Sequence, residues 1–338
     1  MNNKNWRELT ACETVEFRLP YLVSPAFKKL IEDTESSGQK VLRLQVEPSS
    51  YEKKVLKNET ADPLGEAKYC ITPYLIHQYE NRVLLLTTGK CFSYCRYCFR
   101  RGFTSRKQGF INEKELQTVC EYIKKNPQVT EILVSGGDPL TGTFEELKNV
   151  LYSLRRISEN LLIRICTRAP VFAPEVFTQK LFALFKAVQP VWLIPHINHL
   201  NELGFEQKKA LRACLESGIP IQSQTVLLKG VNDEVSALVI LFHTLACMGI
   251  KPGYLFQLDA AAGTSHFRVP LKQALELWRQ LEAKLSGLSR PQFAADLPGG
   301  GGKFPLSALV HIEKIKKKFK NGTFSALGID SVIHKYTL

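Results

Sequence analysis

The chain has 338 residues, of which 44% are hydrophobic, which supports a large core and allows about two domains or one barrel-like α/β domain. Its 45 Lys and Arg against 32 Asp and Glu give a net charge of +13, which suits nucleic acid, an acidic protein partner or anionic cofactors. No run approaches the roughly eighteen apolar residues of a membrane span, and the start lacks a signal-peptide core. We therefore exclude membrane-spanning and secreted classes and expect a cytoplasmic protein.

Along the chain, residues 1–75 are predicted to form an N-terminal helical extension, with amphipathic pieces near residues 25–40. From Arg82 onward, apolar strands alternate with amphipathic helices, which is the pattern of parallel βα units. The six predicted strands cover residues 82–88, 131–135, 162–167, 191–198, 219–227 and 253–259. The helices between them are predicted near residues 112–125, 144–157, 174–187, 204–217 and 233–249. Such units, joined by right-handed crossovers, predict an α/β fold with a partial (βα)6 barrel and an active site at the carboxyl ends of the strands.

The predicted boundaries divide the chain into three segments. Residues 1–75 are the helical extension, residues 76–300 the partial barrel, and residues 301–338 a short C-terminal tail. Five lysines of this tail are predicted to lie on one short helix: Lys314, Lys316, Lys317, Lys318 and Lys320. We interpret them as a solvated helix face rather than a nucleic-acid patch.

Three of the nine cysteines, Cys91, Cys95 and Cys98, follow the first predicted strand within residues 89–101, here named the cysteine loop. Thiolates at spacings of four and three residues can hold an iron–sulfur cube with one iron left open. A zinc loop or three buried thiols are the alternatives, but Cys70, Cys120 and His77 lack the paired spacing of a fourth zinc ligand. An odd cysteine count with three bound to metal argues against a disulfide framework and for a reducing compartment.

Other polar residues fall at predicted strand ends. Ser135, Gly136, Gly137 and Asp138 follow the second strand, where glycines permit close backbone approach, although an ordinary turn with a capping Asp is equally consistent. The ends of the next three strands carry Arg164 and Arg168, then His196, Asn198 and His199, then Gln224. We predict that His196 and Gln224 face a pocket, and we give less weight to His199.

A glycine run, Gly299 to Gly302, stands directly before Lys303. A phosphate-binding Walker loop requires Gly six residues before the Lys and Ser or Thr after it, whereas Leu297 and Phe304 occupy these positions. A flexible linker is the other alternative, although a linker rarely sets one amine between four glycines and an aromatic–Pro pair.

Taken together, these motifs resemble the lysine 2,3-aminomutase family of radical S-adenosylmethionine enzymes. The motifs are Cys-x3-Cys-x2-Cys-x-Arg-Arg, Ser-Gly-Gly-Asp-Pro-Leu, His-Ile-Asn-His, Tyr-Leu-Phe-Gln-Leu-Asp, His-Phe-Arg and Asp-Leu-Pro-Gly-Gly-Gly-Gly-Lys, in unbroken order over about residues 70–310. The resemblance implies an isomerase that shifts the α-amino group of L-lysine to the β-carbon through a 5′-deoxyadenosyl radical.

The resemblance also implies the cofactors and their residues. Cys91, Cys95 and Cys98 would hold a 4Fe–4S cluster that binds S-adenosylmethionine, with Ser135, Gly136, Gly137, Asp138, His196 and Gln224 around that cofactor. Lys303 would bind pyridoxal 5′-phosphate covalently, with Tyr79 and Arg82 nearby. Arg100 would clamp the carboxylate of lysine, and Asp259 and Asp296 would bind its ε-ammonium group.

Several alternatives stay open. The chain length favours the shorter branch of the family, which supplies β-lysine for modification of elongation factor P, whereas the glycine-run segment favours the free-lysine enzymes. Longer members carry a C-terminal zinc-binding cysteine cluster at a subunit contact, but the last cysteine here is Cys247, so a homodimer is expected without that support. A one-electron reductant such as flavodoxin or ferredoxin is the expected partner, with no nucleic acid or membrane. A radical S-adenosylmethionine enzyme without pyridoxal phosphate and a basic nucleic-acid-binding protein with a structural metal are the competing functions.

Overall fold

The computed structural model describes residues 19–104, 109–310, 323–328, 330 and 332–337. The predicted lysine-rich helix of the C-terminal tail lies outside these residues. Within the described part of the chain, no helix has both the length and the apolar character needed to cross a lipid bilayer.

Parallel strands form the centre of the fold, which confirms the α/β partial barrel. In chain order they are β3 (Arg82–Leu86), β4 (Glu131–Ser135), β5 (Leu162–Thr167), β6 (Val191–Pro195), β7 (Gln222–Leu227), β8 (Lys251–Gln257) and β9 (Gln292–Leu297). The first six agree with the predicted strands, although β6 ends three residues early and β7 starts three residues late. Strand β9, which the sequence analysis did not predict, extends the barrel by one more parallel strand.

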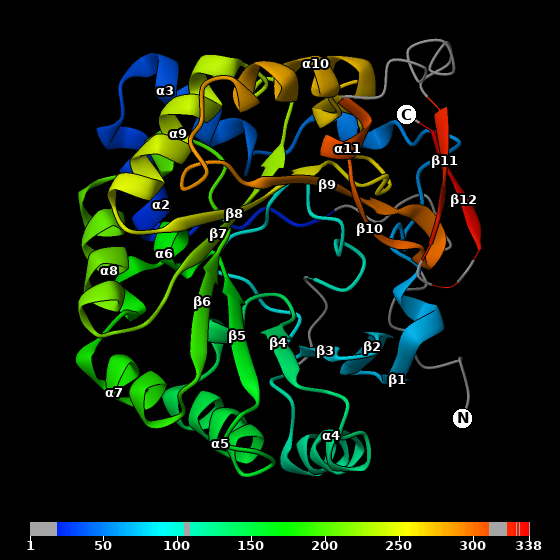
Figure 1. Cartoon of the computed structure of the whole chain (residues 1–338). Helices are drawn as coiled ribbons and strands as arrows, with labels where there is room; N and C mark the ends of the chain where they lie inside the picture. The colour runs from blue at the N-terminus through cyan, green and yellow to red at the C-terminus, as the bar shows by residue number, and fades with distance from the viewer. Residues whose placement is uncertain (1–18, 105–108, 311–322, 329, 331, 338) are drawn as a thin grey trace.

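These strands are divided between two hydrogen-bonded sheets. One has the order β1-β2-β3-β4-β5-β6 and the other the order β10-β9-β8-β7. Isolated parallel bridges, Leu193 to Ile221 and His196 to Gln224, join the two sheets at β6 and β7. The outer strands β1 (Cys70–Thr72), β2 (Leu75–Tyr79) and β10 (Gly302–Pro305) are antiparallel to their neighbours. The strands therefore follow one curved wall, with antiparallel strands at its two free edges (Figure 1).

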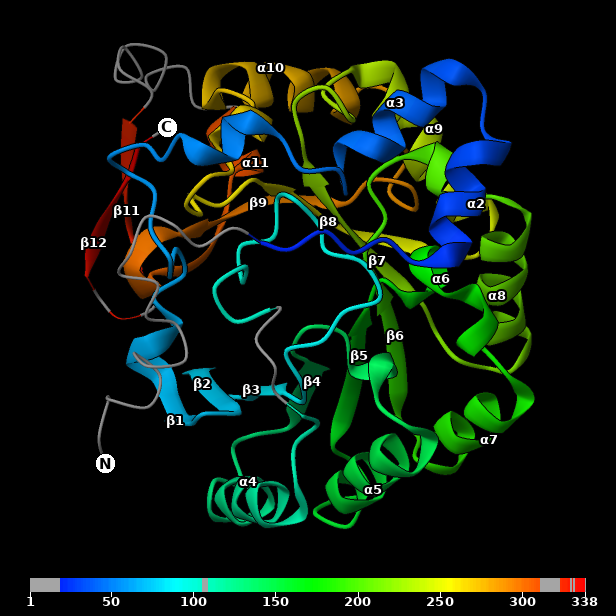
Figure 2. The same ribbon diagram turned by 180° about the vertical axis from the view of Figure 1, so that it is seen from behind.

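Helices cover the outer side of this wall (Figures 1 and 2). They are α4 (Glu113–Lys125), α5 (Phe144–Arg155), α7 (Gln179–Ala187), α8 (Phe205–Glu216), α9 (Val235–Cys247), α10 (Leu271–Glu282) and α11 (Ser307–Val310), whereas the short α6 (Ala169–Phe172) follows the end of β5. Two of these helices begin where the sequence provides reciprocal caps. Asn112 pairs with Glu115 at the start of α4, and Thr143 pairs with Glu146 at the start of α5.

The N-terminal segment adds α2 (Pro25–Asp33) and α3 (Ser36–Leu44), which pack against α6 and η5 (Leu200–Glu202), respectively. Beyond the barrel, β11 (Thr323–Leu327) and β12 (Ile333–Thr337) form a hairpin that the sequence analysis did not predict. Strand β12 contacts β9 and η7 (Pro298–Gly300). The hairpin therefore lies against the glycine run that precedes Lys303.

Candidate active site

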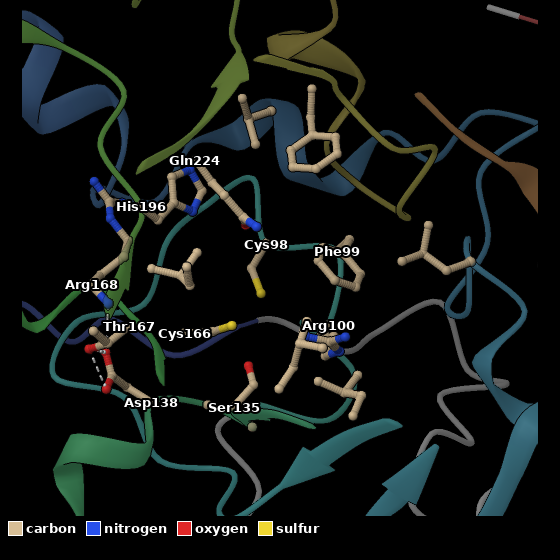
Figure 3. A pocket seen from close by; sticks show the side chains of 18 of the residues that line it. Cys98, Phe99, Arg100, Ser135, Asp138, Cys166, Thr167, Arg168, His196 and Gln224 are labelled. Carbon is tan, nitrogen blue, oxygen red and sulfur yellow. Dashed lines mark hydrogen bonds between the residues drawn. The ribbon is translucent and has the colours of Figure 1, made fainter. Parts of the chain in front are cut away.

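A cavity of about 520 Å³ is enclosed by the inner face of the curved sheet (Figure 3). Side chains alternate between the two faces of a strand, so every second residue of each parallel strand points inward. On β5, Arg164 and Cys166 line the cavity, whereas Ile163 and Ile165 are fully buried on the opposite face. The strand pattern therefore decides which residues can take part in chemistry.

All site residues predicted from the sequence line this one cavity. They are Tyr79, Arg82, Cys91, Cys95, Cys98, Arg100, Ser135, Gly136, Gly137, Asp138, His196, Gln224, Asp259, Asp296 and Lys303. His199, to which the sequence analysis gave less weight, has a local role instead. Its Nδ1 accepts a hydrogen bond of 3.1 Å from the backbone of Asn201 at the start of η5.

The two glycines after β4 pack directly against the start of the cysteine loop. A Cβ atom on Gly137 would lie 2.0 Å from the Lys90 carbonyl oxygen, and one on Gly136, whose φ is 132°, would lie 2.4 Å from the Thr88 oxygen. The Gly137 amide donates to Thr88 at 2.5 Å, and the Asp138 amide donates to Lys90 at 2.7 Å. Only glycine permits this approach, because any side chain would displace backbone.

The Asp138 carboxylate ties this turn to the end of β5. Its two oxygens accept hydrogen bonds from Thr167 Oγ1, both at 2.8 Å, and from the amides of Arg168 at 2.8 Å and Leu140 at 3.0 Å (Figure 3). Burial raises the pKa of Asp138, although these hydrogen bonds oppose the shift. The carboxylate therefore caps η3 (Pro139–Thr141) and links it to the end of β5, and its part in cofactor binding stays a prediction.

Two of the three thiols of the cysteine loop, those of Cys91 and Cys98, are desolvated by burial. Burial raises the pKa of Cys98 to about 11 and that of Cys91 well above its ordinary value. The Cys95 Sγ accepts a hydrogen bond of 3.0 Å from Nη1 of Arg168. Over the part of the chain that the structure describes, no three His, Cys, Asp or Glu side chains are grouped so that they could hold a single metal ion.

Lys303 and Asp296 face each other across β10 and β9 at the other side of the cavity. Lys303 Nζ lies 3.2 Å from each Asp296 oxygen and 4.9 Å from the ring centre of Phe256. The Lys303 amide donates to the Tyr79 hydroxyl at 2.8 Å. Desolvation lowers the pKa of Lys303, but the charge of Asp296, with smaller effects of Tyr79 and Asp259, outweighs it and leaves the pKa raised.

Asp259 follows β8 and lies close enough to Asp296 and Lys303 for their charges to act on it. Burial, followed by the negative charge of Asp296, holds the pKa of Asp259 well above its usual range, although Lys303 opposes the shift. Two carboxylates held together in this way have too little positive charge around them. The pair is therefore suited to bind an additional cation.

Arg100 forms a bidentate ion pair with Glu66, the first residue of η2 (Glu66–Tyr69). Nε lies 3.0 Å from one Glu66 oxygen and Nη2 lies 2.5 Å from the other, and Glu66 is buried. Arg100 Nη1 has no hydrogen-bond partner among the described residues. Glu66 therefore fixes the guanidinium plane in the cavity, while one of its edges can still receive an anion.

Two further arginines line the cavity at the start of β3 and along β5. Arg82 stacks on the Tyr79 ring, with its guanidinium carbon 3.6 Å from the ring centre. Arg164 lies 2.8 Å from Glu131 of the neighbouring strand. Cation–ring stacking holds the Arg82 side chain against the cavity wall and leaves its charge available.

His196 and Gln224 come from β6 and β7, at the bridge that joins the two sheets. Burial, then the charge of Arg168, lowers the pKa of His196 to about 3, so the ring is neutral at physiological pH. Its Nε2 lies 2.8 Å from Asn198 Oδ1, which places the ring hydrogen on Nε2. Nδ1 is then left as a hydrogen-bond acceptor.

Comparison with known proteins agrees with this geometry. A model of the Radical SAM superfamily matches residues 85–239. A Treponema pallidum protein with the name "Putative L-lysine 2,3-aminomutase" is 50% identical over 334 residues, 99% of this chain and 94% of that protein. The chain belongs to the lysine 2,3-aminomutase family. Aminomutases are isomerases, so the chain is an enzyme of this class.

Other members of the lysine 2,3-aminomutase family are more distant. The L-lysine 2,3-aminomutase of Acetoanaerobium sticklandii is 39% identical over 84% of this chain and 68% of its own length. The Escherichia coli enzyme of that name is 36% identical over 73% of this chain and 72% of its own length.

Among solved structures, Streptococcus suis SuiB bound to S-adenosylmethionine matches with a TM-score of 0.50 and 15% identity, over 65% of this chain. The chain spans about half the length of that protein, at 51%. This likeness shows a shared fold.

The sequence analysis of this aminomutase-family chain did not single out Glu66, Cys166, Tyr254 or Phe256 as site residues, although all four line the cavity. Three of them could have been found from strand alternation, because Cys166 lies two residues after Arg164 on β5, and Tyr254 and Phe256 lie two residues apart on β8. Glu66 could not, because it reaches Arg100 from a short helix 34 residues away along the chain.

Proposed function

We propose that the protein converts L-lysine to β-lysine by moving the amino group from the α-carbon to the β-carbon. The observation that carries the proposal is that one cavity holds the cysteine loop, the amine of Lys303 and the carboxylates of Asp259 and Asp296. These groups supply a metal-binding wall, a nucleophilic amine and a cation-binding end. The names of the curated relatives support the same substrate.

A 4Fe–4S cluster fits the thiols of Cys91, Cys95 and Cys98. Each cysteine binds a separate iron in such a cube, so the thiols need not converge on one point, in keeping with the lack of a single-ion site among the described residues. A cluster held by these three thiols alone would keep a position for S-adenosylmethionine.

The wall beside the cysteine loop fits S-adenosylmethionine. We assign to it the polar groups and exposed backbone of Ser135, Gly136, Gly137, Asp138, His196 and Gln224, all of which line the cavity. The neutral His196 ring provides an acceptor, and Gln224 provides a donor and an acceptor. Because three protein donors already bond to the Asp138 carboxylate, Asp138 contributes by shaping the turn.

Pyridoxal 5′-phosphate fits the opposite side of the cavity. Lys303 provides the amine that attaches the cofactor, and its backbone is fixed by the Tyr79 hydroxyl. Arg82, held on the Tyr79 ring, provides a positive charge for the phosphate.

The two ends of lysine would meet opposite charges. We assign the α-carboxylate to the open edge of Arg100 and the ε-ammonium to Asp259 and Asp296. An apolar substrate would leave the buried carboxylates without a partner, at a cost of roughly 3–5 kcal/mol, and glutamate would meet like charge.

When bound, the cluster with S-adenosylmethionine supplies one-electron chemistry and pyridoxal phosphate supplies a carbonyl that takes up amines. The chain contributes orientation and exclusion of water. Leu84, Leu133, Ile194 and Val226 provide apolar wall between the two sides. Such a wall protects reactive carbon centres from solvent.

The cofactor assignment is tested by borohydride reduction of protein loaded with pyridoxal phosphate, followed by peptide mass spectrometry. The pyridoxyl group is expected on Lys303. Lys303→Ala should lose it while it keeps the iron, and Lys284→Ala, an exposed position on the outer surface, should behave as wild type. Full iron content without any pyridoxyl adduct in wild type would favour a radical S-adenosylmethionine enzyme that lacks pyridoxal phosphate.

The substrate assignment is tested with lysine, ornithine, norleucine and glutamate on wild type, Asp259→Asn and Asp296→Asn. Lysine is expected to be the best substrate of wild type, and either substitution should reduce its turnover at least tenfold. Asp233→Asn, in a loop outside the cavity, is the matched control. Faster turnover of glutamate by wild type, or unchanged lysine turnover in both variants, would overturn the assignment.

We further infer a cytoplasmic protein that receives electrons from flavodoxin or ferredoxin and forms a homodimer. The eight described cysteines are free, which suits a reducing compartment. The use of the product in modification of elongation factor P, as opposed to free-lysine metabolism, stays a prediction.

A further inference from the structure

Arg168, at the end of β5, contacts the cysteine loop through its guanidinium group. Nη1 lies 3.0 Å from Cys95 Sγ and 2.5 Å from the Tyr97 hydroxyl. The arginine is buried, with 7% of its surface exposed. Among the described residues, it is the one charged side chain with a hydrogen bond to a thiol of this loop.

Several elements hold this guanidinium in place. Glu202, the fully buried last residue of η5, lies 3.1 Å from Nη2, and Gln45 Oε1 lies 3.4 Å from the same nitrogen. The Phe172 ring packs under the group at 4.3 Å. The backbone amide of Arg168 also donates to the Asp138 carboxylate at 2.8 Å. The charge is therefore fixed and cannot swing toward solvent.

The partners of Arg168 are themselves linked. Asn198 Nδ2 donates to the Tyr97 hydroxyl at 2.7 Å and to Gln45 Oε1 at 3.0 Å. The backbone amide of Asn198 donates to the Glu202 carboxylate at 3.0 Å. A buried network of this kind costs conformational freedom and fixes geometry. Here it fixes one positive charge against one sulfur.

A charged donor on a cluster sulfur has a defined electronic effect. Adding an electron makes the cluster and its sulfurs more negative, so N–H donors and nearby positive charge stabilise the reduced state and raise the reduction potential. Glu202 opposes this effect, because its negative charge offsets that of Arg168. Removing each member of the ion pair should therefore move the potential in opposite directions.

We propose that Arg168 is a positioning residue that holds a fixed positive charge beside the Cys95 sulfur and thereby raises the reduction potential of the cluster. The negative charge of Glu202 lowers that potential. The inference rests on the proposed function, because it requires that Cys95 be a cluster ligand. It assigns to the Arg168–Glu202 pair control over how readily the cluster accepts its electron.

The test is a potentiometric titration of the reconstituted cluster without S-adenosylmethionine, followed by electron paramagnetic resonance. Arg168→Met alone would leave Glu202 buried and unpaired, so the double variant Arg168→Met/Glu202→Gln is used beside Glu202→Gln. At a fixed solution potential, the ratio of reduced to oxidised cluster is expected to fall about tenfold in the double variant, which is equivalent to a decrease of about 59 mV in the reduction potential. The same ratio is expected to rise in Glu202→Gln.

Arg155→Met is the matched control, because this partly buried arginine of α5 binds backbone carbonyls outside the cavity. It should leave the potential unchanged. Ratios of reduced to oxidised cluster within twofold of wild type in both network variants, with full iron content, would overturn the inference and leave the proposed function standing. Unchanged potentials with weaker binding of S-adenosylmethionine would show that Arg168 binds the cofactor instead. Failure of wild type to take up a cluster would overturn both proposals.

Discussion

Replacing Gly137 by alanine is expected to destabilise the protein by separating the turn after β4 from the cysteine loop. The new Cβ would lie 2.0 Å from the Lys90 oxygen and 2.6 Å from the Lys90 carbonyl carbon. Both neighbours are backbone atoms, so the loop must shift. That shift breaks the hydrogen bonds from Gly137 to Thr88 and from Asp138 to Lys90.

The magnitude follows from these two bonds. A buried polar group that loses its partner costs about 1–3 kcal/mol, so the loss is expected to be about 2–6 kcal/mol. The loss is large beside the roughly 5–15 kcal/mol that separates folded from unfolded states in a typical protein. Because Lys90 directly precedes Cys91, the variant should also bind less iron.

The assay is urea-induced unfolding of the iron-free protein by circular dichroism, together with iron content after reconstitution. Gly287→Ala is the control, because a Cβ there would meet no atom within 4 Å. The control should unfold at the wild-type urea concentration or above it. If Gly137→Ala matched Gly287→Ala in stability and iron content, the reasoning about this turn would be refuted.

Three further predictions concern the cavity. Alanine at any one of the three cysteines of the cysteine loop should abolish cluster assembly, measured as bound iron, whereas Cys247→Ala should not; a full cluster in any loop variant contradicts the ligand assignment. Because burial and the charge of Asp296 raise the pKa of Asp259, the ionised carboxylate that the lysine ammonium requires is lost as the pH falls through that raised pKa. Affinity for lysine should therefore rise with pH up to that pKa, and calorimetry in two buffers should show a proton release that Asp259→Asn lacks. Asp138→Asn should lower the free energy of unfolding by about 1–3 kcal/mol, because the new amide NH₂ would face hydrogen-bond donors where the carboxylate accepted hydrogen bonds. An unchanged urea midpoint would argue against the role of Asp138 in linking the turn after β4 to the end of β5.

Local patterns in the sequence carried most of the fold. The parallel strands are apolar runs between amphipathic helices, and reciprocal caps such as Asn112 with Glu115 mark the helix starts. Strand β9 escaped prediction because Phe293 is its one large apolar residue before Leu297, so its pattern is weak. The β11–β12 hairpin lies in a polar tail where alternation is equally weak.

The candidate site was predictable where residues follow strand ends and much less so where contacts are non-local. Cys91, Lys303 and Asp259 stand in recognisable motifs. The pairing of Arg100 with Glu66 depends on a short helix ahead of the barrel, and the contact of Arg168 with Cys95 joins two loops 73 residues apart. No periodicity along the chain encodes such pairs, because they exist only once the barrel has closed.

The most direct test of the proposed function is product analysis. Protein reconstituted with iron, sulfide and pyridoxal phosphate is incubated without oxygen with L-lysine, S-adenosylmethionine and dithionite, and the amino acids are separated. β-Lysine should accumulate with wild type and should not form with Lys303→Ala. Cleavage of S-adenosylmethionine by wild type with lysine left unchanged would contradict the assignment of the protein as a lysine aminomutase.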